Sequence, residues 1–216
     1  RTLISDFPDN RYFFHLISSA GGLFEGQGAI GMESKPYPLR PYGQLKLDQE
    51  LSLLSCDEKI NKRIYRPTSV FGYIGENRRM GLIAALLNNG IKNRISNIFG
   101  SMTTLRDYVL NDEVGRFVAS KVFEASAGLC QVYYLGSGKP SSICEIVRLV
   151  ELELGRKIYI QFSAAAEYGN SLDIVLDKLL LPDNWRPADL RFGVRYVRES
   201  ILDGQDRKFN LKTVNA

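Results

Sequence analysis

The chain has 216 residues, 44% of them hydrophobic and 24% charged, and a formal net charge of +4. Such a composition can fill a sizeable core, which excludes a disordered chain. Its 28 basic residues are scattered among 24 acidic ones, so no nucleic-acid partner is expected. No uncharged apolar stretch approaches the ~20 residues that span a bilayer, so no membrane partner is expected either.

The cysteine and histidine content bears on location and on metal binding. The three cysteines are odd in number and lack the spacing of metal ligands, which is typical of reduced thiols in a cytoplasmic protein. The chain has a single histidine, His15. The sequence therefore predicts a cytoplasmic protein with no metal site and no Ser-His-Asp triad.

The first predicted element is a strand over residues 12–17, an apolar run of the kind found in buried parallel strands. Small residues follow at 18–22 and allow a sharp turn or a close approach to a ligand. A polar loop is predicted over 29–41. The later elements are a helix with Leu47, Leu51 and Leu54 on one face, a strand over 63–66, a helix over 80–87 closed by residues 88–90, a helix beginning at 111 or 112, a strand over 131–135 and a helix over 142–154.

The last of these helices is the best defined. Ser142 and Glu145 have the spacing of a capping box, and Gly155 ends the helix. Because strands alternate with helices along the chain, an α/β fold with a parallel sheet is predicted.

Tyr42 and Lys46 form the first functional candidate. They stand at positions i and i+4, so their side chains leave the same face of a helix. An ammonium near a phenol favours the phenolate, which lets a tyrosine act as a general base or acid near neutral pH. On spacing alone, such a pair is more often an ordinary exposed pair. Its neighbours along the chain decide in favour of function.

Several short motifs surround this pair. In chain order they are Ser18-Ser19, Glu33-x-x-Pro36, Tyr42-Gly43-x-x-Lys46, Arg66-Pro67-Thr68-Ser69, Arg106-Asp107-Tyr108 and Gly136-Ser137-Gly138. Together they resemble the extended short-chain dehydrogenase/reductase family, especially its NAD-dependent sugar-nucleotide epimerases and dehydratases. The resemblance covers nearly the whole chain.

The resemblance implies an α/β fold made of the C-terminal part of a Rossmann-like doubly wound parallel sheet and a smaller α/β substrate-binding domain. Residues 1–72 would be the remainder of the dinucleotide-binding domain, and residues 73–216 mainly the substrate-binding domain, with segments at about 105–135 returning to the Rossmann sheet. No glycine-rich phosphate loop follows a first strand. We therefore expect the chain to be the C-terminal two-thirds of a longer enzyme, and to be inactive and a poor NAD binder alone.

The resemblance also implies roles for individual residues. Tyr42 would take a proton from a sugar hydroxyl while NAD or NADP takes the hydride from the same carbon. The implied catalytic residues are Tyr42, Lys46 and Ser19, the cofactor-binding ones Ser18, Tyr42, Lys46, Pro67 and Ser69, and the substrate-binding ones Ser69, Arg106 and Asn170.

Arg106 is the implied ligand of the substrate's diphosphate. The planar guanidinium can bind two phosphate oxygens at once, which suits this task. An alternative stays open at this stage, in which Arg106 is a surface residue paired with Asp107 or Asp112.

Three positions depart from the family pattern. Ala20 stands where many members have the catalytic hydroxyl, which leaves Ser19 one residue short. Ser69 replaces an asparagine and reaches less far. Glu167 stands where an arginine normally helps to bind the diphosphate, and a carboxylate there would repel it.

The favoured function is NAD(P)-dependent epimerisation of a nucleotide-activated sugar through a keto intermediate, for polysaccharide or glycan precursors, in an enzyme that forms a homodimer. A 4,6-dehydratase or a keto-sugar reductase is the alternative on the same scaffold. Residues 20–22 supply no acid pair, which counts against a dehydratase. A catalytically inactive relative acting as a binding module is the alternative from another class.

Overall fold

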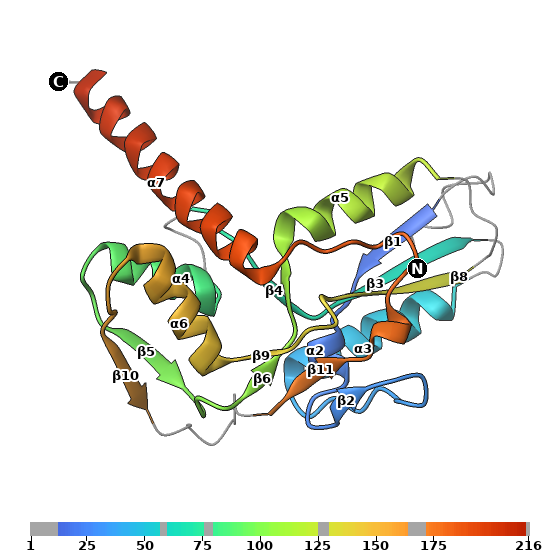
Figure 1. The fold of residues 1–216 in the computed structure, drawn as a ribbon. Coiled ribbons are helices and arrows are strands. Elements are labelled where there is room, and N and C mark those ends of the chain that lie inside the picture. The colour runs from blue at the N-terminus through green and yellow to red at the C-terminus, as the bar shows by residue number, and fades with distance from the viewer. Residues whose placement is uncertain (1–12, 57–59, 76–79, 125–129, 164–171, 215–216) are drawn as a thin grey trace.

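The computed structural model describes residues 13–56, 60–75, 80–124, 130–163 and 172–214. Its elements form two lobes, and α7 projects from one of them (Figure 1). The helices are α2 (Ala20–Leu23), α3 (Pro41–Leu54), α4 (Leu82–Ile91), α5 (Asn111–Val122), α6 (Ile143–Leu154), the short η1 (Lys178–Leu180) and α7 (Leu190–Val214). The strands are β1 (Phe13–Ile17), β2 (Gly28–Ile30), β3 (Asn61–Pro67), β4 (Ser69–Phe71), β5 (Ser96–Phe99), β6 (Leu105–Arg106), β7 (Tyr108–Leu110), β8 (Cys130–Leu135), β9 (Ser141–Ser142), β10 (Ile160–Ser163) and β11 (Ile174–Leu176).

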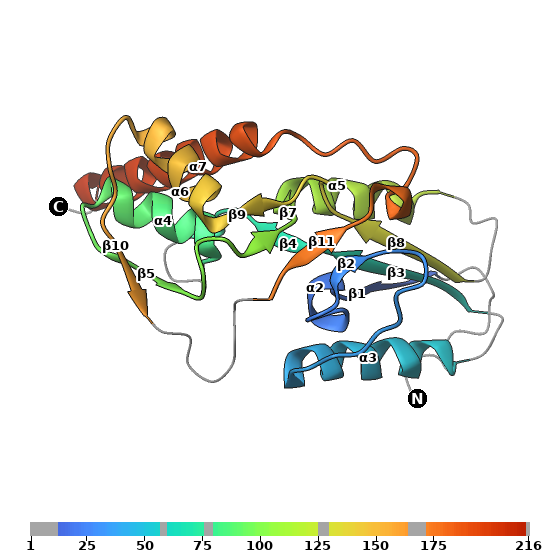
Figure 2. The same ribbon diagram turned by 60° about the horizontal axis from the view of Figure 1, so that its bottom comes forward.

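A parallel sheet in the order β1-β3-β8 forms the centre of one lobe. Helices α5 and α3 lie on either side of these strands (Figures 1 and 2). Successive residues of β3 explain this, because alternate side chains of a strand point to opposite faces. Tyr65 packs against Phe117 of α5, whereas the next residue, Arg66, binds Glu50 of α3. The predicted α/β fold with a parallel sheet is confirmed.

The first strand is parallel to β3 as predicted, but it is not buried. Phe14 and Ile17 are each 43% exposed. Within the described ranges, β1 pairs with β3 alone and is the end strand of its sheet. An apolar run indicates burial only where other elements cover the faces to which its side chains point, and Phe14 and Ile17 are only partly covered.

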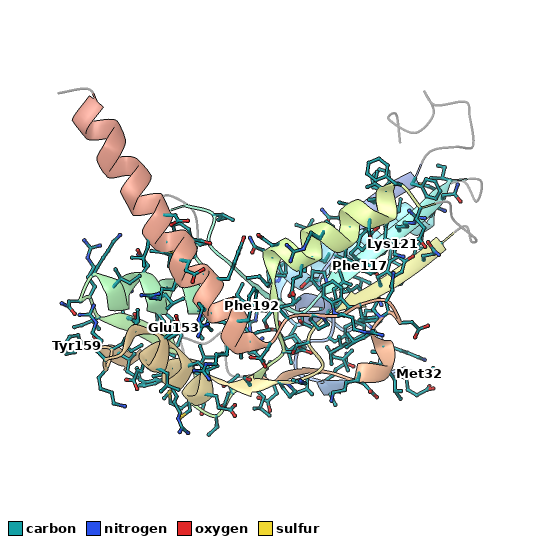
Figure 3. The ribbon with its side chains drawn as sticks, turned by 45° about the horizontal axis from the view of Figure 1, so that its top comes forward. Met32, Phe117, Lys121, Glu153, Tyr159 and Phe192 are labelled. Atoms are coloured by element: carbon teal, nitrogen blue, oxygen red, sulfur yellow. The ribbon has the colours of Figure 1, made fainter. Side chains whose placement is uncertain are left out.

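Basic and aromatic side chains hold α5 on the sheet. Arg63, 1% exposed, donates to the backbone carbonyls of Lys121 and Glu124 at the C-terminal end of α5, where a cation is favoured. The Lys121 ammonium lies 5.3 Å from the ring centre of Phe117 and 5.4 Å from that of Tyr133. Figure 3 labels Phe117 and Lys121 on α5. These contacts of Arg63 and Lys121 hold α5 on the face of the sheet that it covers.

The other lobe packs α4, α6 and α7 around an apolar core. Leu86, Ile146 and Val197 are fully buried there, one from each helix. Glu153 of α6 lies beneath α7 (Figure 3), where its carboxylate is within 3.6 Å of Arg195 and 3.7 Å of Arg198. The three helices therefore form one packed unit.

The predicted capping box of α6 is confirmed. The Ser142 side chain accepts from the Glu145 N–H, and the Glu145 carboxylate accepts from the Ser142 N–H at 2.7 Å. Gly155 ends the helix with φ at 67°, a left-handed conformation that glycine adopts without strain.

The predicted end of α4 at residues 88–90 is wrong. The helix continues to Ile91, and the left-handed residue is Asn93, with φ at 52°. Gly90 serves packing instead. A Cβ there would lie 2.5 Å from Leu154 Cδ1 and 3.0 Å from Ile158 Cγ2, so glycine lets α4 approach the end of α6.

Short strands connect the lobes. Strand β11 is parallel to β2 and β6, β6 is antiparallel to β9, and β4 is parallel to β7. Part of the predicted loop over 29–41 is thus strand β2. These short strands carry Ser69, Arg106 and Ile174 to the carboxyl end of the β1-β3-β8 sheet.

Candidate active site

Tyr42 and Lys46 occupy the first turns of α3. Pro41 takes the first helical position, where its fixed φ suits the helix and its missing N–H costs nothing. The Lys46 Nζ lies 5.9 Å from the centre of the Tyr42 ring, and it donates to the carbonyl of Ile17 at 2.9 Å. The ammonium thus links the helix to the carboxyl end of β1. Tyr42 is 57% exposed, so a ligand can reach its hydroxyl.

Two glycines bring α2 against α3 and so place the tyrosine. A Cβ on Gly43 would lie 2.1 Å from the carbonyl oxygen of Gly22 and 2.8 Å from the Cβ of Pro38. A Cβ on Gly22 would lie 3.1 Å from two atoms of the Tyr42 ring. The absence of side chains at both positions lets the Tyr42 ring rest on the backbone of α2.

We expect Gly43→Ala to lower the free energy of unfolding by ~1–3 kcal/mol, because its methyl group must push α2 away from α3. Gly115→Ala in α5 is the matched control. No atom lies within 4 Å of a Cβ there, so alanine should stabilise the helix by ~0.5–1 kcal/mol. Urea unfolding of both variants measures the difference, and equal stabilities would contradict the close contact.

Ser18 and Ser19 follow β1 but differ in their surroundings. Ser19 caps α2, and its Oγ accepts from the Gly22 N–H at 3.1 Å. Ser18 is 2% exposed, its N–H donates to the Tyr65 carbonyl at 2.7 Å, and its Oγ has no partner within the described residues. Ala20 is fully buried in the core. Ser19 is therefore the hydroxyl that reaches the cavity described next.

A cavity of about 380 Å³ lies beside Tyr42 and is called the substrate cavity below. It brings together four of the predicted residues, namely Ser19, Tyr42, Ser69 and Arg106. Its other lining residues are Gly21, Gly22, Glu25, Arg40, Gly43 and Ile174. Three predicted residues lie outside this lining. Ser18 follows the carboxyl end of β1, Pro67 ends β3, and Lys46 is on α3.

The end of β3 leads Ser69 into the cavity. Pro67 pairs with Leu135 at the end of the sheet, and the N–H of Thr68 donates to the Leu135 carbonyl at 2.9 Å. The chain then changes partners, and the N–H of Ser69 donates to the Asp107 carbonyl at 2.9 Å. This step places Ser69 beside the segment that carries Arg106.

Arg106 reaches the same cavity, and its neighbouring acid is otherwise engaged. Burial is the main cause that lowers the pKa of Arg106. Asp107 is fully buried; its carboxylate accepts from the N–H and the hydroxyl of Ser137, both at 2.7 Å, and from the N–H of Gly138. Asp112 accepts from the Tyr196 hydroxyl. Asp107 and Asp112 therefore both have hydrogen-bond partners other than Arg106.

Glu25 and Arg40 are charged cavity residues that the sequence analysis missed. They form an ion pair, with Glu25 7% exposed. Arg40 stands two residues before Tyr42, at the N-cap of α3. Neither belongs to a motif quoted above, and their meeting depends on the contact between α2 and α3. The pattern of residues along the chain carries no signal for it.

Two curated proteins are similar to the chain in sequence. The dTDP-4-dehydro-6-deoxyglucose reductase of Escherichia coli is 26% identical over 183 residues, which are 80% of this chain and 56% of the reductase. A Methanocaldococcus jannaschii protein provisionally named a UDP-glucose 4-epimerase is 27% identical over 74% of this chain and 52% of its own. The chain thus spans about half the length of the curated relatives it matches. No protein-family model matches it.

Solved structures show the same fold. The UDP-glucose 4-epimerase of Thermus thermophilus, in complex with NAD, superposes with a TM-score of 0.72 at 19% identity, over 88% of this chain and 64% of that one. The UDP-glucuronic acid 4-epimerase of Bacillus cereus, in complex with UDP-glucuronic acid and NAD, gives 0.73 at 21% identity, over 90% and 63%. The chain therefore has the fold of these NAD-bound UDP-sugar epimerases. The Rossmann-like fold class is confirmed with it.

Two of the predicted site positions lie outside the described residues. They are Asn170, an expected substrate ligand, and Glu167, the departure from the family pattern. Among the side chains that the structure describes, no three His, Cys, Asp or Glu residues gather as a metal site. None of the helices in the described ranges combines the length and apolar character of a membrane span.

Proposed function

We propose that this chain carries the catalytic tyrosine and the substrate cavity of an NAD(P)-dependent epimerase acting on a nucleotide-activated sugar through a transient keto intermediate. The observation that carries the proposal is the meeting of Ser19, Tyr42, Ser69 and Arg106 in one cavity. They come from segments far apart in the sequence and supply an acid/base group, hydroxyl donors and a phosphate-binding cation.

NAD or NADP is the proposed cofactor, and the carboxyl edge of the β1-β3-β8 sheet has residues that fit it. Ligands of open α/β sheets bind outside the carboxyl ends of the strands. At this edge, Ser18 has a buried Oγ without a partner among the described residues, and the Lys46 ammonium stands between Tyr42 and β1. These groups suit the hydroxyls of a ribose, and Pro67 would border the nicotinamide. When bound, the cofactor accepts and returns the hydride.

Tyr42 moves the proton in this proposal. Its phenol oxygen takes the proton of the sugar hydroxyl and returns it after the keto sugar has exposed its other face. The Lys46 ammonium stabilises negative charge on that oxygen. Ser19 accepts from a backbone N–H of α2, which leaves its O–H to donate to the substrate oxygen. Ser69 and Arg106 hold the sugar and the diphosphate.

A keto-sugar reductase is the second candidate, because the Escherichia coli relative is a reductase. A 4,6-dehydratase and an inactive binding module are further alternatives. The test is to incubate the protein from its complete gene with UDP-glucose and NAD, and in parallel with a nucleotide keto sugar and reduced cofactor, and to follow the sugar by NMR. An epimerase forms the C4 epimer without net consumption of cofactor, a reductase consumes reduced cofactor with a keto-sugar substrate, and a dehydratase releases a keto sugar. Binding without turnover of these substrates would contradict the proposal.

We expect Arg106→Ala to raise KM for the nucleotide sugar by ~10- to 100-fold while NAD affinity changes little, since one charge-assisted contact is lost. Initial rates over a range of both ligands measure the two effects. An equal loss for both ligands, or no loss, would point to a structural arginine. Glu167→Arg is the companion variant, and it should tighten nucleotide binding if a diphosphate lies there.

Finer features of the proposal extend beyond this site. We propose that the boundary near residue 72 separates a cofactor-binding part from a mainly substrate-binding part, with β8 belonging to the first. We also propose a homodimeric, cytoplasmic enzyme that serves polysaccharide or glycan precursor synthesis. Size-exclusion chromatography with light scattering tests the dimer.

A further inference from the structure

The substrate cavity contains three charged residues close together. Glu25 forms an ion pair with Arg40, and their side chains are 8% and 29% exposed. The charges of Glu25 and Arg40 both influence the pKa of Arg106. Burial lowers the pKa of Arg106 most, Glu25 raises it and Arg40 lowers it, alongside raising effects of Tyr108 and Asp173. Two arginines and one carboxylate therefore line a single cavity, with positive charge in excess.

We infer that Arg40 is a second anion-binding residue of the substrate cavity and that Arg40 and Arg106 together hold an acidic group of the ligand. Two guanidinium groups in one partly buried cavity repel each other, and an oxyanion between them turns this repulsion into attraction. Each guanidinium has five N–H donors in a planar fork, so Arg40 can bind Glu25 and a ligand oxyanion together. Glu25 offsets part of the Arg40 charge and competes with the ligand oxyanion for the same fork.

This inference deepens the proposed function and rests on it for the identity of the ligand. The shared chemistry is an anion with paired oxygens, which matches a guanidinium fork. In a nucleotide sugar this anion is either the diphosphate or a carboxylate on the sugar. The cavity of about 380 Å³ falls within the usual size range of ligand pockets.

The test is calorimetric titration of the protein and of Arg40→Gln with UDP, UDP-glucose and UDP-glucuronic acid. Glutamine keeps hydrogen-bonding capacity without the charge, so we expect affinity to fall about 10- to 100-fold for each ligand whose anion Arg40 binds. Arg148→Gln is the matched control. Arg148 is exposed on α6, so this substitution removes the same charge outside the cavity. It should leave all three affinities unchanged.

Glu25→Gln separates anion binding from a structural ion pair. If Arg40 served only as the partner of Glu25, the two variants would lose the same affinity and the same thermal stability. If Arg40 binds the anion, Glu25→Gln keeps or raises the affinity, because a negative charge leaves the cavity, whereas Arg40→Gln lowers it. Matching losses in the two variants would overturn the inference, as would unchanged affinities for all three ligands in Arg40→Gln.

The ligand series also identifies the anion and separates this inference from the proposed function. A loss with UDP assigns the diphosphate to Arg40, whereas a loss with UDP-glucuronic acid alone assigns the sugar carboxylate. Inorganic diphosphate is the fourth probe. If it binds in an Arg40-dependent way to a protein that ignores UDP, the anion site stands and the nucleotide-sugar function fails. A protein that binds none of the four overturns the inference.

Discussion

Replacing Tyr42 by phenylalanine in the complete enzyme is expected to lower kcat for the nucleotide sugar by ~10²–10⁴-fold, the usual contribution of a general acid/base. The variant removes only the phenol oxygen. The ring keeps its place on Gly22, and the side chain is 57% exposed, so the fold should keep its stability. We therefore expect this variant to lose activity without losing stability, as happens when a residue acts on the substrate.

Tyr159→Phe is the matched control for this variant. Tyr159 is 63% exposed and lies in the other lobe, next to β10 (Figure 3), so loss of its hydroxyl should leave kcat unchanged. Lys46→Met should weaken both turnover and cofactor affinity, because its ammonium lies between Tyr42 and the end of β1. Turnover of the Tyr42→Phe enzyme close to that of the natural enzyme would remove the tyrosine from the mechanism.

Local signals along the chain predicted the elements that depend on neighbours in sequence. The capping box of Ser142 and Glu145 marked the start of α6, and Gly155 marked its end, because both signals act within one turn of the helix. Gly90 gave a misleading signal. A glycine can serve either a left-handed turn or a close packing contact, and only the position of α6 decides between these uses.

The site was predictable only where its residues belong to ordered motifs. Tyr42, Ser19, Ser69 and Arg106 came from such motifs, and the structure brings all four to one cavity. The Glu25–Arg40 pair could not be found this way, since it arises from the packing of α2 on α3. The two charges meet only in the folded structure, and no regular spacing in the sequence marks them as partners.

A buried ion pair holds α3, the helix of Tyr42 and Lys46, on the sheet. Tyr42, Lys46 and Glu50 follow one another at intervals of four residues, so they share one face of α3. Glu50 is 2% exposed, and both of its oxygens bind Arg66 of β3, at 3.0 and 2.5 Å. Arg66 also donates to the Tyr134 hydroxyl. Burial by itself would lower the pKa of Arg66, but the hydrogen bonds and charge of Glu50, with Tyr134, raise it.

We expect Arg66→Met to lower the free energy of unfolding by about 3–5 kcal/mol, because it leaves the Glu50 carboxylate buried without a countercharge. The matched control is Lys157→Met. Lys157 is 90% exposed in its pair with Glu151, so its loss should cost less than about 1 kcal/mol. Urea unfolding of both variants gives the comparison, and similar losses would mean that the buried pair stabilises no more than a surface pair.

The double variant Glu50→Leu/Arg66→Met distinguishes a buried charge from lost packing. Two apolar side chains in place of the pair remove the uncompensated carboxylate, so stability should recover by several kcal/mol relative to Arg66→Met alone. Activity should not recover equally, because the bidentate contact that fixes the orientation of α3, and with it Tyr42 and Lys46, is still absent. A double variant as unstable as Arg66→Met would show that packing around Arg66, rather than the charge of Glu50, sets the cost. A stable double variant with full kcat would show that the pair is not needed to position α3.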